Sequence, residues 1–285
     1  MNSSASAVRA RIARLFVYPV KSCAGVEVRE ALLTETGLDL DRAWMVVDGE
    51  GRFVTQRQLP RMALVRPQIR HSEVVLRAPG MLALHLSIDS VEEPVKVRVW
   101  GDEVAAYDMG AVAAQWFTDF LGQPLRLVRF DPEQRRLSDA RWTSGAEALN
   151  QFSDGFPLLV LGEAAVDELN GRLGAAGHAP VGIERFRPNI VLAGLPAHEE
   201  DRAARMTIAA AEPVELRLVK PCGRCPIPNI DPATGEVSPH VLATLMQYRR
   251  NDLIAGKAAF GMNAIVARGV EQTLRVGQQV DAAAD

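Results

Sequence analysis

The sequence lacks a long apolar run, an excess of basic residues and a secretory signal. Its longest apolar stretches, such as residues 156–161, are far shorter than the roughly 20 residues of a membrane-spanning helix. Lys and Arg number 32 against 35 Asp and Glu, so the charge does not point to nucleic acid as a partner. Residues 1–14 are polar and then basic, without the apolar core of a signal peptide. We therefore expect a cytoplasmic protein that binds neither nucleic acid nor a membrane.

Motifs of several common enzyme classes are missing as well. The 285 residues contain no Gly-x-x-x-x-Gly-Lys phosphate loop, no Gly-x-Gly-x-x-Gly segment after a strand and no Gly-x-Ser-x-Gly nucleophile elbow. The five histidines are scattered without the spacing of metal ligands. These absences argue against the nucleotide-binding and serine hydrolase classes, and they leave the cysteines as the residues to follow.

Alternation of apolar and polar residues is the dominant pattern in the chain. Residues 95–100 and 214–218 alternate strictly, which is the period of a half-buried strand. Helical spacing occurs over residues 111–121, 163–173 and 238–248, the last with Ser238 as the expected N-cap. Because strands outnumber helices without a regular strand–helix alternation, a doubly wound sheet is not expected. The pattern predicts an α+β, β-rich protein.

Two further segments carry specific expectations. Residues 44–47 and 53–56 are strand candidates that flank a Gly-containing turn, which predicts a β-hairpin. Residues 131–153 are the least periodic part of the chain, polar and rich in Arg. Such a segment is either a joint between domains or a loop that folds over a site.

The cysteine count is three, namely Cys23, Cys222 and Cys225. An odd and sparse set does not make a disulfide scaffold. A structural zinc site needs about four ligands, which these residues do not supply. A thioredoxin-like dithiol usually starts a helix, whereas the prolines at 226 and 228 oppose one after Cys225. Two readings stay open from the residues alone: a pair of packed thiols without chemistry, or a thiolate ligand to a metal cofactor, which the cationic Arg224 would favour.

The segment around this cysteine pair resembles the cysteine motif of MOSC domains, the molybdenum cofactor sulfurase C-terminal family. A second set of segments near the N-terminus resembles the MOSC N-terminal β-barrel domain. The order and number of the matches make the resemblance strong, and together they span nearly the whole chain. The matching segments are residues 218–235, 18–25, 37–38, 41–44, 55–57, 186–189 and 260–263.

The resemblance implies two domains. It places an N-terminal β-barrel-like domain at residues 1–125 and a C-terminal MOSC β-barrel with flanking helices at residues 126–285. A molybdenum cofactor, a pterin with a phosphate tail that carries molybdenum, is expected in the crevice between them. The resemblance also raises pyridoxal phosphate binding as a term applied to such proteins.

The family motif also implies which side chains form the site. Cys225 matches the cysteine that binds molybdenum and is therefore the expected metal ligand and catalytic residue, whereas Cys222 is expected to be a neighbour of the metal and not a ligand. A soft thiolate suits a metal that already carries sulfur ligands. Forked guanidinium and ammonium groups suit an anionic cofactor. The expected cofactor-binding residues are Lys21, Ser22, Arg42, Ser153, Asp154, Arg187, Asn189, Arg224 and Asn263.

The function implied by the resemblance is an oxidoreductase that reduces N-hydroxylated substrates such as hydroxylaminopurines and amidoximes. No cysteine follows Cys225, so an iron–sulfur centre of its own is not expected, and electrons would arrive from a separate flavin or iron–sulfur protein. A monomer is expected. Two other functions stay open: a sulfur carrier that uses a persulfide on Cys225, and a module that binds or stores the molybdenum cofactor.

Overall fold

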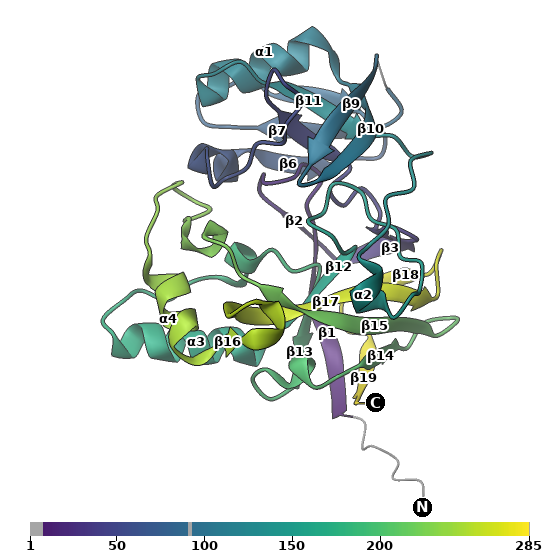
Figure 1. Ribbon diagram of the computed structural model, residues 1–285, viewed down its shortest axis with the longest axis vertical. Coiled ribbons are helices and arrows are strands. Elements are labelled where there is room, and N and C mark those ends of the chain that lie inside the picture. The colour runs from purple at the N-terminus through teal and green to yellow at the C-terminus, as the bar shows by residue number, and fades with distance from the viewer. Residues whose placement is uncertain (1–7, 91–92, 285) are drawn as a thin grey trace, which may run out of the picture.

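The computed structural model describes residues 8–90 and 93–284. Figure 1 shows two lobes stacked along the long axis of the molecule, both rich in strands. The lower lobe in this view carries both described ends of the chain, and the upper lobe is formed by segments from the first half. The predicted α+β, β-rich fold is confirmed.

A seven-stranded barrel forms the lower lobe. Its strands run in the order β12, β13, β1, β19, β14, β15 and β17, and β12 pairs with β17 to close the ring. Strands β2 and β16 add to its edges beside β1 and β17. The predicted alternation in β15 arises because Val214, Leu216 and Leu218 pack into the barrel core. The bounds are β1 Val8–Val17, β2 Val26–Val28, β12 Leu158–Gly162, β13 Ile190–Ala193, β14 Arg205–Ile208, β15 Val214–Gly223, β16 Arg250–Asn251, β17 Lys257–Arg268 and β19 Gln279–Ala283.

The upper lobe holds a four-stranded sheet, a three-stranded sheet and one long helix. The first sheet has the order β5, β11, β10, β9, and the second has the order β6, β7, β8. A further three-stranded sheet, β18, β3, β4, lies beside the barrel. The bounds are β3 Glu30–Thr34, β4 Gly37–Leu38, β5 Trp44–Val47, β6 Arg66–Ile69, β7 Glu73–Arg77, β8 Leu84–Ser87, β9 Pro94–Val99, β10 Asp102–Asp108, β11 Arg126–Phe130 and β18 Thr273–Arg275.

Three helices lie where helical spacing predicted them, and a fourth is short. The helix α1 ends at Gly122, whose φ of 78° is the left-handed conformation that glycine adopts without strain. Pro239 is the N-cap of α4, so this helix begins one residue later than predicted. The bounds are α1 Gly110–Leu121, α2 Ala140–Thr143, α3 Glu163–Ala175 and α4 His240–Tyr248, with 3-10 helices at Pro60–Leu64, Ile183–Phe186, Glu199–Asp201, Ile227–Asn229 and Asp252–Ile254. None of the described helices is long and apolar enough to cross a bilayer.

The strands of both lobes cross the domain boundary expected at residue 125. The barrel takes β1 from the first half of the chain, where it pairs with β13 and β19. Strand β11 begins just after that boundary but pairs with β5 and β10 of the upper lobe. The boundary at residue 125 remains a prediction. Each lobe contains a strand from the other side of it, β1 in the barrel and β11 in the upper lobe.

The hairpin expected at residues 44–56 differs from the observed structure. All four residues of β5 are buried, and the strand pairs with β11. Val47 meets Phe53 through a single bridge. The backbone N–H groups of Gln58 and Leu59 both donate to the carbonyl of Thr55, so the chain turns there instead of continuing as a strand. This turn brings Thr55 and Arg57 to the cavity described below.

Candidate functional site

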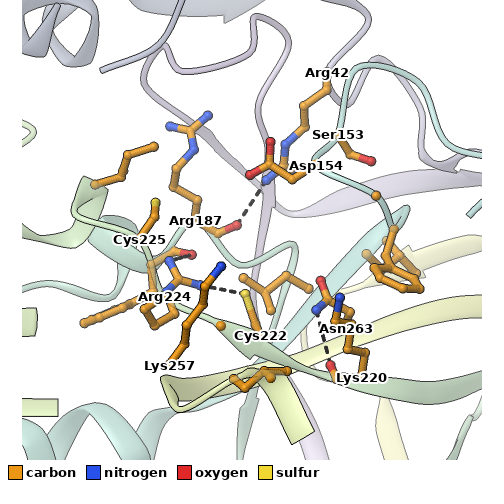
Figure 2. A pocket seen from close by; sticks show the side chains of 18 of the residues that line it. Arg42, Ser153, Asp154, Arg187, Lys220, Cys222, Arg224, Cys225, Lys257 and Asn263 are labelled. Atoms are coloured by element: carbon orange, nitrogen blue, oxygen red, sulfur yellow. Dashed lines mark hydrogen bonds between the residues drawn. The ribbon is translucent and has the colours of Figure 1, made fainter. Parts of the chain in front are cut away.

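A cavity of about 480 Å³ lies between the two lobes and is lined by residues from both. Figure 2 shows its side chains from close by. The structure brings all the expected site residues together in this cavity. They are Lys21, Ser22, Arg42, Ser153, Asp154, Arg187, Asn189, Arg224, Cys225 and Asn263.

Cys222 lies near the end of β15, and Cys225 lies on the short loop between β15 and the following 3-10 helix. The strand pairs with β17 through three register shifts, two of them within residues 218–223, and these irregularities turn the chain toward the cavity. The backbone N–H of Arg224 donates to the carbonyl of Ala258 at 2.8 Å and holds the loop against β17. Cys222 and Cys225 are half-buried free thiols, and both line the cavity.

The guanidinium of Arg224 is directed at Cys222 and not at Cys225. Its Nη1 donates to the Cys222 Sγ at 3.0 Å, and its Nη2 donates to the carbonyl of Phe186 at 2.9 Å. Figure 2 shows the contact with Cys222 as a dashed line. The Nε is buried and has no hydrogen-bond partner among the described residues. Arg224, which the sequence places beside both cysteines, thus makes its side-chain contact with Cys222.

Lys21 and Asp154 form an ion pair in the lining of the cavity. The buried Lys21 Nζ lies 2.6 Å from the Asp154 Oδ1 and donates to the carbonyl of Phe152 at 2.7 Å. Burial lowers the pKa of Lys21. Desolvation of Asp154 raises its pKa, but the charge and hydrogen bond of Lys21 hold the pKa of Asp154 well below its usual range. The pair therefore stabilises the charged form of Asp154.

The guanidinium groups of Arg42 and Arg187 both lie over the ring of Tyr18. Their guanidinium carbons are 4.5 Å and 4.3 Å from the ring centroid of Tyr18. Arg42 pairs with the buried Asp41 and donates to the carbonyl of Arg187 at 3.2 Å. Arg187 donates to the carbonyl of Cys23. Burial, reinforced by the charge of Arg42, lowers the pKa of Arg187 to about 10, so Arg187 remains cationic at neutral pH.

Three of the expected site residues have a left-handed backbone. The φ angles of Ser22, Arg42 and Arg187 are 65°, 52° and 58°. A residue with a Cβ pays roughly 1 kcal/mol or more for this conformation, and such residues cluster at functional sites. The fold therefore holds these three side chains in the cavity at some cost in backbone energy.

The remaining expected residues use their polar groups within the protein. The Asn189 Oδ1 accepts from the Arg42 guanidinium at 3.0 Å and from the backbone of Leu159 at 3.1 Å. The Ser153 hydroxyl donates to Asn150 at 2.9 Å. The Asn263 amide donates to the carbonyl of Lys220 at 3.2 Å. These contacts fix the walls of the cavity.

Sequence reasoning missed several residues that line the cavity. Arg57 lies in a segment that matched the family, and its position there was the signal that could have found it. Arg141 and Trp142 come from the aperiodic segment 131–153, which the structure places over the cavity as a loop, one of the two interpretations given above. The missed polar, charged and aromatic residues also include Thr55, Phe156, Lys220 and Lys257.

The lining of the cavity is strongly cationic although the chain as a whole is mildly acidic. Eight basic side chains face a single acidic one, Asp154. A concave surface with one sign of charge concentrates ligands of the opposite sign. The site therefore favours an anionic ligand. The basic residues are Lys21, Arg42, Arg57, Arg141, Arg187, Lys220, Arg224 and Lys257.

Comparison with known families gives two matches that follow each other along the chain. The MOSC N-terminal beta barrel domain matches residues 9–124, and the MOSC domain matches residues 148–281. Human mitochondrial amidoxime-reducing component 1 is 38% identical over an alignment of 251 positions, which covers 85% of this chain and 72% of that protein. Rat mitochondrial amidoxime reducing component 2 is 34% identical over an alignment of 286 positions, which covers 94% of this chain and 82% of that protein. Human molybdenum cofactor sulfurase is 28% identical and matches 94% of this chain but 32% of its own length.

These relatives correct one expectation and leave another without support. The cytoplasmic location is contradicted, because relatives that match most of the chain are named mitochondrial components. The location was inferred from the lack of a secretory signal, and that lack does not bear on targeting to organelles. Pyridoxal phosphate binding finds no support in these comparisons.

Proposed function

The chain belongs to the MOSC family, and on this premise we propose that it reduces N-hydroxylated compounds with a molybdenum cofactor held between its two lobes. The observation that carries the proposal is the half-buried thiol of Cys225 in a cavity with eight basic side chains and one acidic one. The names of the amidoxime-reducing relatives supply the reaction type.

The chemistry of the lining fits such a cofactor. Its phosphate and pterin would be held by the cationic groups of Lys21, Arg42, Arg187 and Arg224. The buried Nε of Arg224 is a donor without a partner among the described residues, and a bound ligand could satisfy it. The Cys225 thiolate would hold the molybdenum, for which sulfur is a suitable ligand. Within residues 8–90 and 93–284 no three His, Cys, Asp or Glu side chains are grouped to hold a metal, so a metal at Cys225 would take its other ligands from elsewhere.

The proposed reaction breaks the N–O bond of the substrate. Two electrons and two protons convert the N–OH group to N–H and release water. The bound cofactor supplies the two-electron redox change, and a separate flavin or iron–sulfur protein supplies the electrons. The chain contributes a fixed thiol at Cys225, cations that neutralise the cofactor and a cavity open to solvent beside Asp154, whose side chain is 67% exposed.

The proposal is tested by preparing the protein from a host that makes molybdenum cofactor. Molybdenum and pterin are measured, and turnover of benzamidoxime and 6-hydroxylaminopurine is followed with a reduced viologen as electron source. We expect one molybdenum per chain and turnover, both abolished in Cys225→Ala. Cys222→Ala is the matched control and should retain both, because Cys222 is not the proposed ligand.

Two outcomes contradict the proposal. A persulfide trapped on Cys225 in a protein without molybdenum would indicate sulfur transfer. Stoichiometric molybdenum without turnover of any N-hydroxylated compound would indicate a module that binds or stores the cofactor.

A further inference from the structure

One wall of the cavity is aromatic, in contrast to the cationic groups around it. Trp142 and Phe156 both line the cavity and are half-buried. The ammonium of Lys220 lies 4.9 Å from the ring centroid of Trp142 and 5.6 Å from that of Phe156. These three residues are called the aromatic wall below. Aromatic faces with a nearby cation, left half-open in a cavity, are a suitable surface for a planar ligand.

The residues of the aromatic wall come from three elements that are each held in place. Trp142 lies in α2, whose N-cap Asp139 accepts from the backbone of Arg141 at 3.0 Å. The loop that carries α2 is fixed at its base by Arg136, which pairs with Asp102 at 2.9 Å and donates to the carbonyl of Ser153 at 2.8 Å. Phe156 precedes β12, and Lys220 lies on β15. The wall therefore combines a hydrogen-bonded loop with residues beside and on strands of the barrel.

The aromatic wall lies next to the cysteine segment and apart from the main cluster of cations. Lys220 is two residues from Cys222 on the same strand, and its carbonyl accepts from Asn263. In Figure 2, Lys220 and Asn263 lie on the opposite side of Cys222 from Cys225 and Arg187. Arg42 and Arg187 are held around Tyr18. A cofactor anchored at those arginines with its metal at Cys225 leaves the aromatic wall for a second ligand.

We propose that Trp142, Phe156 and Lys220 form the subsite that receives the planar ring of an N-hydroxylated heteroaromatic substrate. This inference rests on the proposed reductase function. The ring would stack on the indole and phenyl faces, because every nucleobase-like ring offers a π-face for such a contact. The ammonium of Lys220 would attract the electron-rich oxygen of the N–OH group and orient it toward the metal side of the cavity. The aromatic wall would then discriminate ring substrates from small aliphatic ones.

The test compares Trp142→Ala with Trp142→Phe in the cofactor-loaded protein. The KM for 6-hydroxylaminopurine should rise on the order of 10-fold in Trp142→Ala, because stacking of one base contributes about that much. The KM for acetamidoxime, which has no ring, should stay the same, and so should kcat and the molybdenum content. Trp142→Phe keeps an aromatic face and should stay near the parent values. Phe156→Ala removes the other ring of the aromatic wall, which lies outside α2. It replaces Trp142→Ala in the test if that variant does not fold.

A binding measurement separates this inference from the proposed function. Adenine, the reduced product of 6-hydroxylaminopurine, is titrated calorimetrically into the loaded protein without reductant. Its Kd should rise on the order of 10-fold in Trp142→Ala, even if no substrate turns over. Equal KM changes for both substrates, or an unchanged adenine Kd, would overturn the subsite. Loss of molybdenum in Trp142→Ala would also overturn it, because the wall would then hold the pterin.

Discussion

The cationic end and the aromatic wall of the cavity are built in different ways. At the cationic end, the side chains of Lys21 and Arg42 are 7% and 13% exposed, and each donates to a backbone carbonyl. On the aromatic wall, Trp142 and Phe156 are half-open, and Lys220 is held by the faces of two rings. Buried, hydrogen-bonded cations are preorganised for a ligand that stays. Half-open rings are suited to a ligand that enters and leaves.

The backbone shows the same contrast. Ser22, Arg42 and Arg187, all at the cationic end, have positive φ angles. Trp142 lies within a regular helical turn, and Lys220 lies on a strand. Strain is tolerated where the surrounding structure over-determines it. The cationic end therefore carries the positive φ angles, whereas Lys220 of the aromatic wall belongs to a strand of the barrel itself.

Removing Arg42 should have the largest effect, because it breaks a buried pair. Arg42→Ala leaves Asp41 buried without its cation and removes the bonds to Asn189 and to the carbonyl of Arg187. Losing one partner of a buried pair costs about 3–5 kcal/mol. The free energy of unfolding, measured with urea, should fall by about that amount. The matched control is Arg135→Ala, which breaks an exposed pair with Glu147 and should cost less than about 1 kcal/mol. An equal loss of unfolding free energy in Arg42→Ala and Arg135→Ala would contradict the view that the cationic end is preorganised by buried pairs.

Lys21→Met should separate ligand binding from stability. The buried ammonium loses hydration, and its partner Asp154 is 67% exposed and remains solvated without it. We expect the free energy of unfolding to stay within about 1 kcal/mol of the parent, or to rise. The retention of cofactor should fall roughly 10-fold to 100-fold, because a charge-assisted hydrogen bond contributes about 1.5–3 kcal/mol. Pterin content after gel filtration measures this, and an unchanged content would remove Lys21 from the binding site.

The dependence of cofactor binding on pH follows from the same lysine. Burial lowers the pKa of Lys21 from its ordinary value of 10.5. As the pH rises, this lysine therefore loses its proton and its charge earlier than a free lysine does. An anionic cofactor prefers the charged form, and its affinity should therefore fall as the pH rises through the lowered pKa. Lys21→Met carries no charge at any pH and should show a flatter profile. Pterin release followed by fluorescence checks this, and parallel profiles for the two proteins would contradict it.

The local pattern predicted the elements better than the partners of each element. The alternation at residues 95–100 and 214–218 and the helix ending at Gly122 could be read directly, because each depends on neighbours in sequence. The pairing of β5 with β11 could not be predicted in this way, because it joins residues about 80 positions apart. The local pattern instead predicted a hairpin at residues 44–56.

The same limit explains what was found of the site. Lys21, Arg187 and Cys225 stand in segments that resemble a family, so their convergence could be expected. Trp142 stands in an aperiodic loop, and its approach to Lys220 depends on where that loop crosses the barrel. A cation–π contact between distant segments leaves no periodic signal in the sequence.

Lys220→Met should have the smallest effect on the stability of the fold. Compared with Lys21→Met, it tests directly whether the aromatic wall and the cationic end hold different ligands. Its ammonium rests on two half-open rings and makes no ion pair with the described residues. The longer part of the stem is kept by Met, so the free energy of unfolding should change by less than about 0.5 kcal/mol. Cofactor content should also stay at the parent level, unlike in Lys21→Met, while the KM for 6-hydroxylaminopurine rises. If Lys220→Met instead loses pterin as Lys21→Met does, both ends of the cavity hold the same anionic ligand, and the division between a resident and a passing ligand fails.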